Sequence, residues 1–318
     1  MKSCKVIKSG LFTTVQDLGR YGFQRYGVPV SGVMDNYAFV VANLLVGNKP
    51  NDACLEMTLL GPELEFINDA QIAITGAAFL PTINGENDAG WQTLHVCNGD
   101  VLSFGRLQSG CRAYVAVRGG VDVPVVLGSR STYVRGGFGG FEGRRLKAGD
   151  VIQTYMPSTF LKSGFLMPQE LIPCYSNDVM VEVVLGPQSD YFTDRGLETL
   201  LSSIYTVTAE SDRMGYRLDG AKVEQKDSLN MVSDAIPVGA VQVPRSGKPI
   251  LVMRDAQTTG GYPKIAVVTT PDVSRLGQAK PNDKIQFSKI SPSKARTKLL
   301  EHMKTLSQMK GKLIKTGM

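Results

Sequence analysis

The sequence predicts a mainly β protein with two domains. Its 318 residues correspond to about two domains at roughly 100–200 residues each. Hydrophobic residues make up 42% of the chain, which is enough for packed cores, and the 34 glycines and 16 prolines indicate many turns. Short runs that are β-branched or alternate apolar with polar residues, bounded by Gly, Pro, Asn or Asp, supply the expected strands.

The first half of the chain contains strand candidates and one helix candidate. We expect strands at residues 64–67, 71–75, 101–104 and 113–117. Residues 35–46 are apolar nearly all round, with Asp35 suited to the N-cap and Gly47 to the position after the last turn. Because only Asn36 and Asn43 interrupt the apolar surface, we expect a buried helix that plugs or covers the end of a β-barrel.

The second half begins after a segment with little periodicity. Residues 158–177 hold three prolines when Pro157 is counted, together with Gly164, and are expected to link a domain at 1–157 to a domain at 178–290. We expect a helix at 189–202 with Ser189 as its N-cap. Further strands are expected at residues 179–185, 238–243, 250–253, 264–270 and 284–287. Residues 291–318 form a basic tail with apolar residues at helical spacing over 295–306.

The net charge of +6 is concentrated in this tail. Residues 288–318 carry eight Lys or Arg and one Glu, so the remainder of the chain sums to −1. A basic body that binds nucleic acid is therefore not expected. Five cysteines without a C-x-x-C pair favour reduced thiols and a cytoplasmic protein. The two histidines lie far apart, and no run of about 18 apolar residues occurs, so neither a Cys/His metal site nor a membrane span is expected.

Several standard catalytic motifs are missing from the sequence. Gly247-Lys248 is followed by Pro249 where a Walker A loop needs Ser or Thr to reach magnesium. The Gly-rich run at residues 136–143 does not spell the dinucleotide-binding pattern, and no G-x-S-x-G elbow is present. Met309-Lys310 lies in the basic tail rather than on a hairpin, so covalent biotin on this chain is not expected.

Three segments carry more polar and glycine residues than packing requires. They are residues 13–22 with 31–35, residues 211–215, and residues 242–263. Arginine offers a bidentate fork for carboxylate or phosphate, and Gly260-Gly261 lets backbone N–H groups face an anion. Structural explanations remain open for the same residues. Asp35 suits an N-cap, Thr258-Thr259-Gly260-Gly261 suits a hairpin turn, and Arg20 and Arg213 suit salt bridges.

Long motifs in these segments resemble a known family. The motifs include GLFTTVQDLGRYGFQRYGVPVSGVMDNYA, LEMTLLGPELEF, GCRAYVAVRGGVDVPVVLGSRST, LGPQSDYF, SDRMGYRLDG and GAVQVPRSGKPILVMRDAQTTGGYPKIAVV. In order, they resemble the C subunit of 5-oxoprolinase, a family also described as KipA-like or allophanate hydrolase subunit 2, which forms half of the carboxyltransferase domain of urea carboxylase. The resemblance runs from Gly10 to about Phe287 and leaves out the tail. It implies two cyclophilin-like β-barrel domains.

The resemblance also implies an activity and partners. The family's C subunit works with a KipI-like B subunit and an A subunit to open L-5-oxoproline to L-glutamate at the expense of ATP. Phosphate placed on the lactam oxygen gives a good leaving group, and such a step uses cations and Mg²⁺. We therefore expect ATP and Mg²⁺ for the complex, a chain that is inactive alone, and a multi-subunit or homo-oligomeric assembly.

The site residues are those of the family motifs. Arg20 and Arg213 are expected to hold phosphate or the substrate carboxylate, and Asp35 and Asp255 to hold Mg²⁺ directly or through water. The residues expected to bind substrate are Gln242, Thr258, Thr259, Gly260 and Gly261, with Tyr262 as a wall of the pocket.

Two other functions remain open at this point. One is carboxyl transfer from biotin on a separate protein, as in urea carboxylase. The other is a non-enzymatic regulator that binds a KipI-like protein. The sequence alone does not decide among 5-oxoproline, urea and related amides as the substrate.

Overall fold

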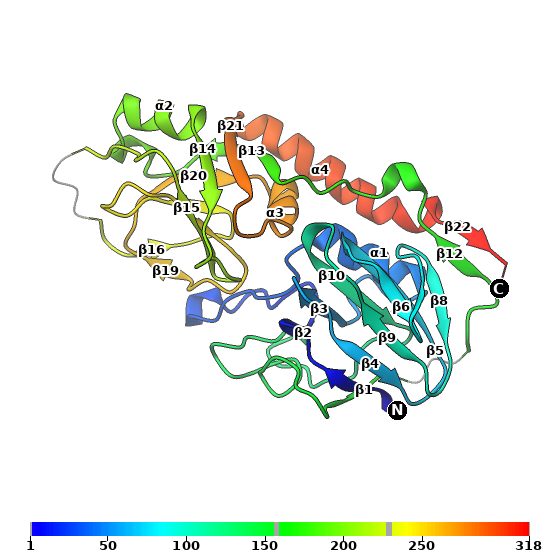
Figure 1. The fold of residues 1–318 in the computed structure, drawn as a ribbon. Coiled ribbons are helices and arrows are strands. Elements are labelled where there is room, and N and C mark those ends of the chain that lie inside the picture. Colours follow the sequence, from blue (N-terminus) through cyan, green and yellow to red (C-terminus); the bar gives the residue numbers. More distant parts are fainter. Residues whose placement is uncertain (1, 156–158, 227–230, 318) are drawn as a thin grey trace. The chain divides into compact units, whose positions relative to one another are not determined.

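The computed structural model describes residues 2–155, 159–226 and 231–317. The chain divides into two compact units (Figure 1). The first unit takes in residues 1–20, 31–175 and 305–318, and the second takes in 21–30 and 176–304. Each unit therefore includes a segment that is distant in sequence from the rest of it.

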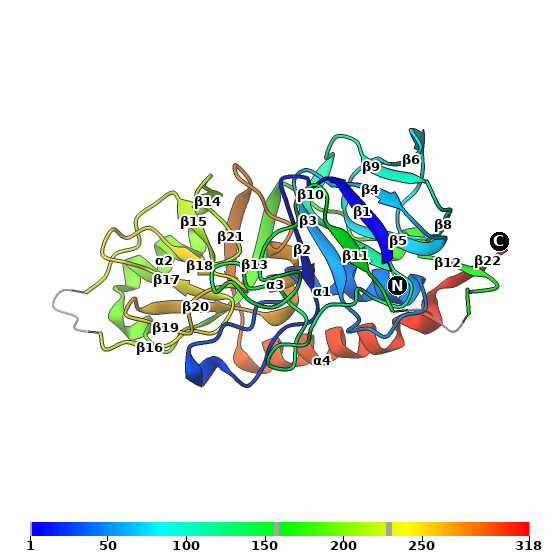
Figure 2. The same cartoon turned by 90° about the horizontal axis from the view of Figure 1, so that it is seen from below.

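The first unit contains two large antiparallel sheets that enclose a hydrophobic core. The first sheet has the order β11 (Val151–Gln153), β1 (Lys2–Lys8), β4 (Glu63–Phe66), β9 (Val101–Phe104), β6 (Pro81–Ile83) and β7 (Glu86–Asn87). The second has the order β2 (Phe12–Gln16), β3 (Cys54–Thr58), β10 (Ser109–Val117), β5 (Ala70–Ala78) and β8 (Thr93–Val96). Figure 2 shows β1 beside β11 and β4. Alternate apolar residues of both sheets, such as Val6, Phe66, Ile72 and Val115, form the core.

Helix α1 (Asn36–Leu45) packs against β5 and β10 of the second sheet. Asp35 caps its N-terminus and Gly47, with φ of 71°, follows its last turn, which confirms both expectations. Eight of its ten residues are buried, so the expected buried helix is also confirmed. The helix covers the face of a sheet rather than the end of a barrel, and the hydrophobic cluster that contains it includes Trp91 and Tyr114.

The second unit is a closed barrel. Its strands follow the order β13 (Asp178–Leu185), β20 (Lys264–Val268), β17 (Ala240–Gln242), β18 (Ile250–Val252), β15 (Gly215–Asp219), β14 (Ile204–Val207) and β21 (Lys284–Lys289). β13 and β21 run parallel and close the ring. A small separate sheet pairs β16 (Asp234–Ala235) with β19 (Thr259–Gly260). The predicted mainly β fold and a barrel are confirmed.

Two helices of the second unit differ from the sequence-based expectation. Ser189 does not cap a long helix, because residues Ser189–Tyr191 form a 3-10 turn. Helix α2 (Asp194–Ser202) begins later, where Thr193 accepts a hydrogen bond from the Gly196 N–H. Helix α3 (Thr270–Leu276) begins at Thr270, although the sequence predicts a strand through that residue, since Pro271 favours the first turn of a helix.

The C-terminal tail begins with helix α4 (Pro292–Gln308), which confirms the expected helix. A 3-10 turn (Met309–Lys312) follows it. Strand β22 (Ile314–Thr316) then pairs with β12 (Gly164–Leu166). β12 lies in the range expected to be a linker, and Met309 is fully buried in the α1 core. The remaining 3-10 turns are Gln24–Tyr26 and Gln169–Leu171.

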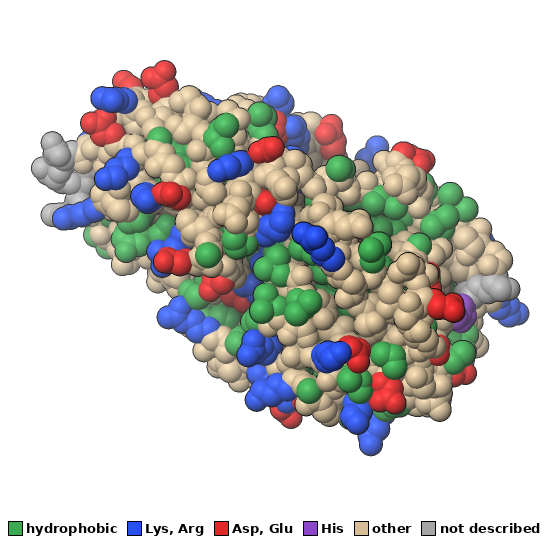
Figure 3. Space-filling view, in the orientation of Figure 1, with side chains coloured by type: hydrophobic (Ala, Val, Ile, Leu, Met, Phe, Trp, Pro, Cys, Tyr) green, Lys and Arg blue, Asp and Glu red, His purple; other side chains and the backbone are tan. Residues whose placement is uncertain are grey.

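The helices of this chain are short or polar. Within residues 2–155, 159–226 and 231–317, every helix is too short or too polar to cross a bilayer. On the face drawn in Figure 3, basic and acidic side chains are interspersed.

Candidate functional site

The expected site residues fall in both units. Arg20 and Asp35 belong to the first unit, and all the others belong to the second. The barrel brings Arg213 together with Asp255, and it brings Gln242 together with Tyr262. Arg20 and Asp35 have separate sets of partners.

Arg20 is a fully buried residue that holds a loop. Its Nε donates to the Val126 carbonyl at 3.0 Å and one Nη to the Ser131 carbonyl at 2.8 Å. The guanidinium also lies 4.9 Å from the centre of the Phe138 ring. Gly139 approaches so closely that a Cβ there would lie 2.2 Å from the Ser131 carbonyl oxygen. These contacts assign Arg20 a positioning role for the 126–139 loop.

Asp35 is occupied at the start of α1. Its Oδ1 accepts the N–H groups of Tyr37 and Ala38, and its Oδ2 accepts the Tyr175 hydroxyl at 2.9 Å. The side chain is buried beside Tyr114, whose hydroxyl accepts the Asp35 N–H and donates to Glu56 at 2.9 Å. Burial, together with the Glu56 and Asp35 charges, raises the pKa of Tyr114 well above its ordinary value. The N-cap explanation of Asp35 is confirmed by this geometry.

Arg213 and Asp255 form a bidentate ion pair in the second unit. Arg213 Nε lies 2.8 Å from Asp255 Oδ2 and Nη2 lies 3.2 Å from Oδ1. The backbone N–H of Asp255 donates to the Arg213 carbonyl, so main chain and side chains fix the same pair. Both side chains are almost fully buried. Next to the pair, Arg254 donates to the hydroxyl of Tyr21 at 3.3 Å.

Gln242 holds the backbone of a segment that lines a pocket of the second unit. Its buried amide Nε2 donates to the Tyr262 carbonyl at 3.2 Å, which fixes the segment where β19 leads into β20. Gly261 and Tyr262 line the pocket, as the sequence predicted for Tyr262. Thr258 and Thr259 do not line it: the Thr258 carbonyl accepts the Ile236 N–H, and Thr259 pairs with Ala235.

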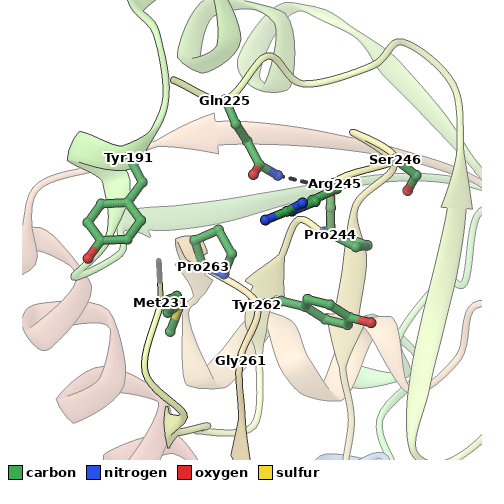
Figure 4. A pocket seen from close by; sticks show the side chains of 9 residues that line it. All are labelled: Tyr191, Gln225, Met231, Pro244, Arg245, Ser246, Gly261, Tyr262 and Pro263. Atoms are coloured by element: carbon green, nitrogen blue, oxygen red, sulfur yellow. Dashed lines mark hydrogen bonds between the residues drawn. The ribbon is translucent and has the colours of Figure 1, made fainter. Parts of the chain in front are cut away.

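The pocket has a volume of about 530 Å³ and lies wholly in the second unit. Figure 4 shows Tyr191 on one side and Tyr262 on the other, with Pro263 between them and Arg245 and Gln225 above. Met231, Pro244, Ser246 and Gly261 complete the lining. Such a mixture of apolar walls and a few polar groups is typical of small-molecule sites.

An ion pair between a buried lysine and a half-exposed aspartate, next to the pocket, escaped sequence analysis. Lys264, almost fully buried, lies 2.7 Å from Asp234 Oδ2, which also accepts the Gln188 amide at 3.2 Å. The hydrogen bond from Lys264 lowers the pKa of Asp234. This pair fastens β16, and with it β19, to the barrel. Tyr191 and Gln225 were also missed, because Tyr191 lies far from the other pocket residues in sequence, Gln225 lies near Met231 alone, and no spacing rule connects them.

The residues expected to hold magnesium do not build such a site in this chain. Asp35 uses both carboxylate oxygens as hydrogen-bond acceptors, and both oxygens of Asp255 face Arg213. Among the described residues, no group of three or more His, Cys, Asp or Glu side chains is gathered as a metal site. Magnesium favours several oxygen ligands, so this geometry does not fit a magnesium site formed by these two carboxylates.

Comparison with known proteins gives one family. The model of the carboxyltransferase domain, subdomain A and B, matches residues 26–289. The C subunit of the 5-oxoprolinase of Escherichia coli is 38% identical over 292 residues, which span 92% of each chain. The urea amidolyase of Lachancea kluyveri is 38% identical over 313 residues, which span 92% of this chain and 17% of the amidolyase.

A solved structure agrees with the sequence comparison. The crystal structure of the K. lactis urea amidolyase superposes with a TM-score of 0.90 at 35% identity. The superposition covers 96% of this chain and 20% of the amidolyase chain. The chain thus spans a small part of the amidolyases and nearly all of the oxoprolinase subunit.

Proposed function

Because the chain belongs to the family of carboxyltransferase domains with subdomains A and B, we propose that it is the C subunit of an ATP-dependent 5-oxoprolinase. The reaction converts L-5-oxoproline, ATP and two molecules of water into L-glutamate, ADP and phosphate. The proposed partners are a KipI-like B subunit and an A subunit, and the chain alone is inactive.

One observation carries this proposal. The match to the C subunit of 5-oxoprolinase spans 92% of both chains, whereas the match to urea amidolyase covers 17% of that protein. The proposal therefore follows the relative that the chain matches over nearly all of that relative's length. The five cysteines are free thiols, which supports a reducing compartment such as the cytoplasm.

The reaction needs activation of a poor electrophile. ATP supplies a phosphoryl group that turns the lactam oxygen into a leaving group. In this proposal the chain binds and orients the substrate in the pocket of Tyr191, Arg245 and Tyr262, with Gln242 fixing the Tyr262 backbone. Since Asp35 and Asp255 are already hydrogen-bonded, the partner subunits supply the ligands for Mg²⁺ and for most of ATP.

A second candidate is carboxyl transfer from biotin to urea or a related amide. It is favoured by the family description and by the TM-score of 0.90 to the urea amidolyase. In that case a separate biotin-carrying protein and a biotin carboxylase would be required.

The experiment is reconstitution with an A and a B subunit. We expect glutamate and ADP to form in equal amounts when 5-oxoproline is added, with no turnover by this chain alone. Urea and bicarbonate, offered with a biotinylated carrier protein and its carboxylase, serve as the competing assay. Carboxylation of urea without any opening of 5-oxoproline would overturn the proposal in favour of the second candidate.

A further inference from the structure

The turn that carries Arg245 is rigidly held. The Gly247 N–H donates to the Pro244 carbonyl at 2.9 Å, which closes a tight turn with Arg245 and Ser246 at its corners. The Val223 N–H donates to the Gly247 carbonyl at 2.9 Å, and the Gln225 amide donates to Val243 and Pro244 carbonyls at 2.8 and 2.9 Å. The backbone of Arg245 is therefore fixed before any ligand arrives.

Arg245 gives the pocket its charge. Among the nine described residues that line the pocket, it is the one that carries a formal charge at neutral pH. Of the neighbouring cations, Lys264 pairs with Asp234 and Lys248 pairs with Asp219. Within the part of the chain that the structure describes, no carboxylate lies within ion-pair distance of Arg245. An anion in the pocket would therefore meet the Arg245 guanidinium, whose charge no other described residue of the pocket lining neutralises.

Gln225 adds a hydrogen-bond acceptor to the pocket, whereas Arg245 is a donor. Its Nε2 hydrogens are used by the two carbonyls of the turn, which leaves Oε1 as the atom that the side chain offers to a ligand. Figure 4 shows the Gln225 amide above Pro263, close to the Arg245 guanidinium. The pocket thus presents a cation and a hydrogen-bond acceptor side by side, over an apolar floor of Pro263 and Met231.

We propose that this pocket selects small cyclic amides that carry a carboxylate. Arg245 binds the carboxylate, Gln225 Oε1 accepts the amide N–H, and the ring methylenes lie against Pro263 and Tyr262. This inference rests on the proposed function and deepens it, because Arg245 then distinguishes 5-oxoproline from neutral amides such as urea. Charged hydrogen bonds contribute about 1.5–3 kcal/mol each, so removing the fork weakens binding roughly tenfold or more.

The test measures binding directly on the full chain. Titrations with L-5-oxoproline, with 2-pyrrolidinone (the same ring without the carboxylate) and with urea are followed by NMR for the wild type and for Arg245→Gln. We expect 5-oxoproline to bind at least about tenfold more weakly to Arg245→Gln. We expect 2-pyrrolidinone to bind weakly and equally to both proteins. Arg217→Gln is the matched control, because Arg217 is an exposed barrel arginine that does not line the pocket.

The outcomes separate this inference from the proposed function. Equal affinity of wild type and Arg245→Gln for 5-oxoproline, or no binding by the wild type, overturns the pocket assignment. A reconstituted complex that opens 5-oxoproline with an unchanged KM after Arg245→Gln overturns the pocket assignment while the proposed function stands. A complex without that activity, built on a chain that binds 5-oxoproline through Arg245, overturns the function and leaves the pocket assignment intact.

Discussion

Arg213 and Asp255 join two loops of the second unit by a two-pronged ion pair, at 2.8 and 3.2 Å, with almost no solvent access. A buried pair of this kind is costly to break, because removing one partner leaves the other charge in a poorly solvated place. The pair is therefore a structural element of the barrel whatever else it does in a complex.

Asp255→Asn is expected to destabilise the second unit. The amide keeps the shape but removes the negative charge opposite Arg213, at a cost of about 3–5 kcal/mol of unfolding free energy. Hydrogen exchange of the barrel strands β15 and β18 measures the loss locally. The control is Lys248→Gln, which breaks an exposed ion pair with Asp219 and is expected to leave exchange unchanged. Equal exchange in Asp255→Asn and wild type would show that the charge of Asp255 is not needed for folding.

The sequence predicted those helices and strands whose bounds depend on residues close together in the chain. Asp35 and Gly47 delimit α1 as expected, since capping depends on residues within one turn. The strand runs and the tail helix follow from hydrophobic period. The predicted start of α2 was wrong because Ser189 and Thr193 are both good N-cap residues, and only packing decides between them.

The pocket was only half predictable. Gly261 and Tyr262 lie in the polar segment at residues 242–263, and Arg245 lies in the same segment but was not among the expected site residues. Tyr191 and Gln225 come from elements that meet only after the barrel closes, so no short-range pattern connects them. The pairing of β12 with β22 was invisible for the same reason: about 150 residues separate the two strands, and both are very short.

Asp35→Ala is expected to lower the stability of the first unit by about 1–3 kcal/mol. The change removes the cap of α1 and leaves the Tyr175 hydroxyl without its Asp35 acceptor. Asp35→Asn keeps an acceptor oxygen and is expected to lose less. Thermal unfolding followed by the fluorescence of Trp91, the single tryptophan, measures both. Equal losses in the two variants would contradict the cap. Activity of the Asp35→Asn complex then decides whether the charge also serves the reaction.

Stability is expected to fall in alkali as buried tyrosines ionise. Burial raises the pKa of Tyr37, in the first unit, and of Tyr205, in the barrel, from 10.0 to about 12. Since both pKa values are raised on folding, their contribution is complete below pH 10 and is lost as the pH rises through 12. Urea midpoints between pH 8 and pH 12 measure the fall, and Tyr205→Phe should make it shallower. A midpoint that is flat up to pH 12 would contradict the buried environment.

The C-terminal tail carries two methionines in different environments, Met303 and Met309. Met309 is fully buried in the α1 core together with Trp91, whereas the Met303 side chain on α4 is 57% exposed. Met309→Ala leaves a cavity and is expected to cost the first unit about 2–5 kcal/mol. Met303→Ala removes few contacts and is expected to stay within about 0.5 kcal/mol of the wild type.

Trp91 reports this comparison directly, because it lies in the same cluster as Met309. Urea unfolding followed by its fluorescence should show an earlier midpoint for Met309→Ala and an unchanged one for Met303→Ala. Deletion of residues 309–318 should move the midpoint at least as far, since it also removes the β22 partner of β12. If Met309→Ala and Met303→Ala unfold together with the wild type, the tail does not contribute to the core of the first unit.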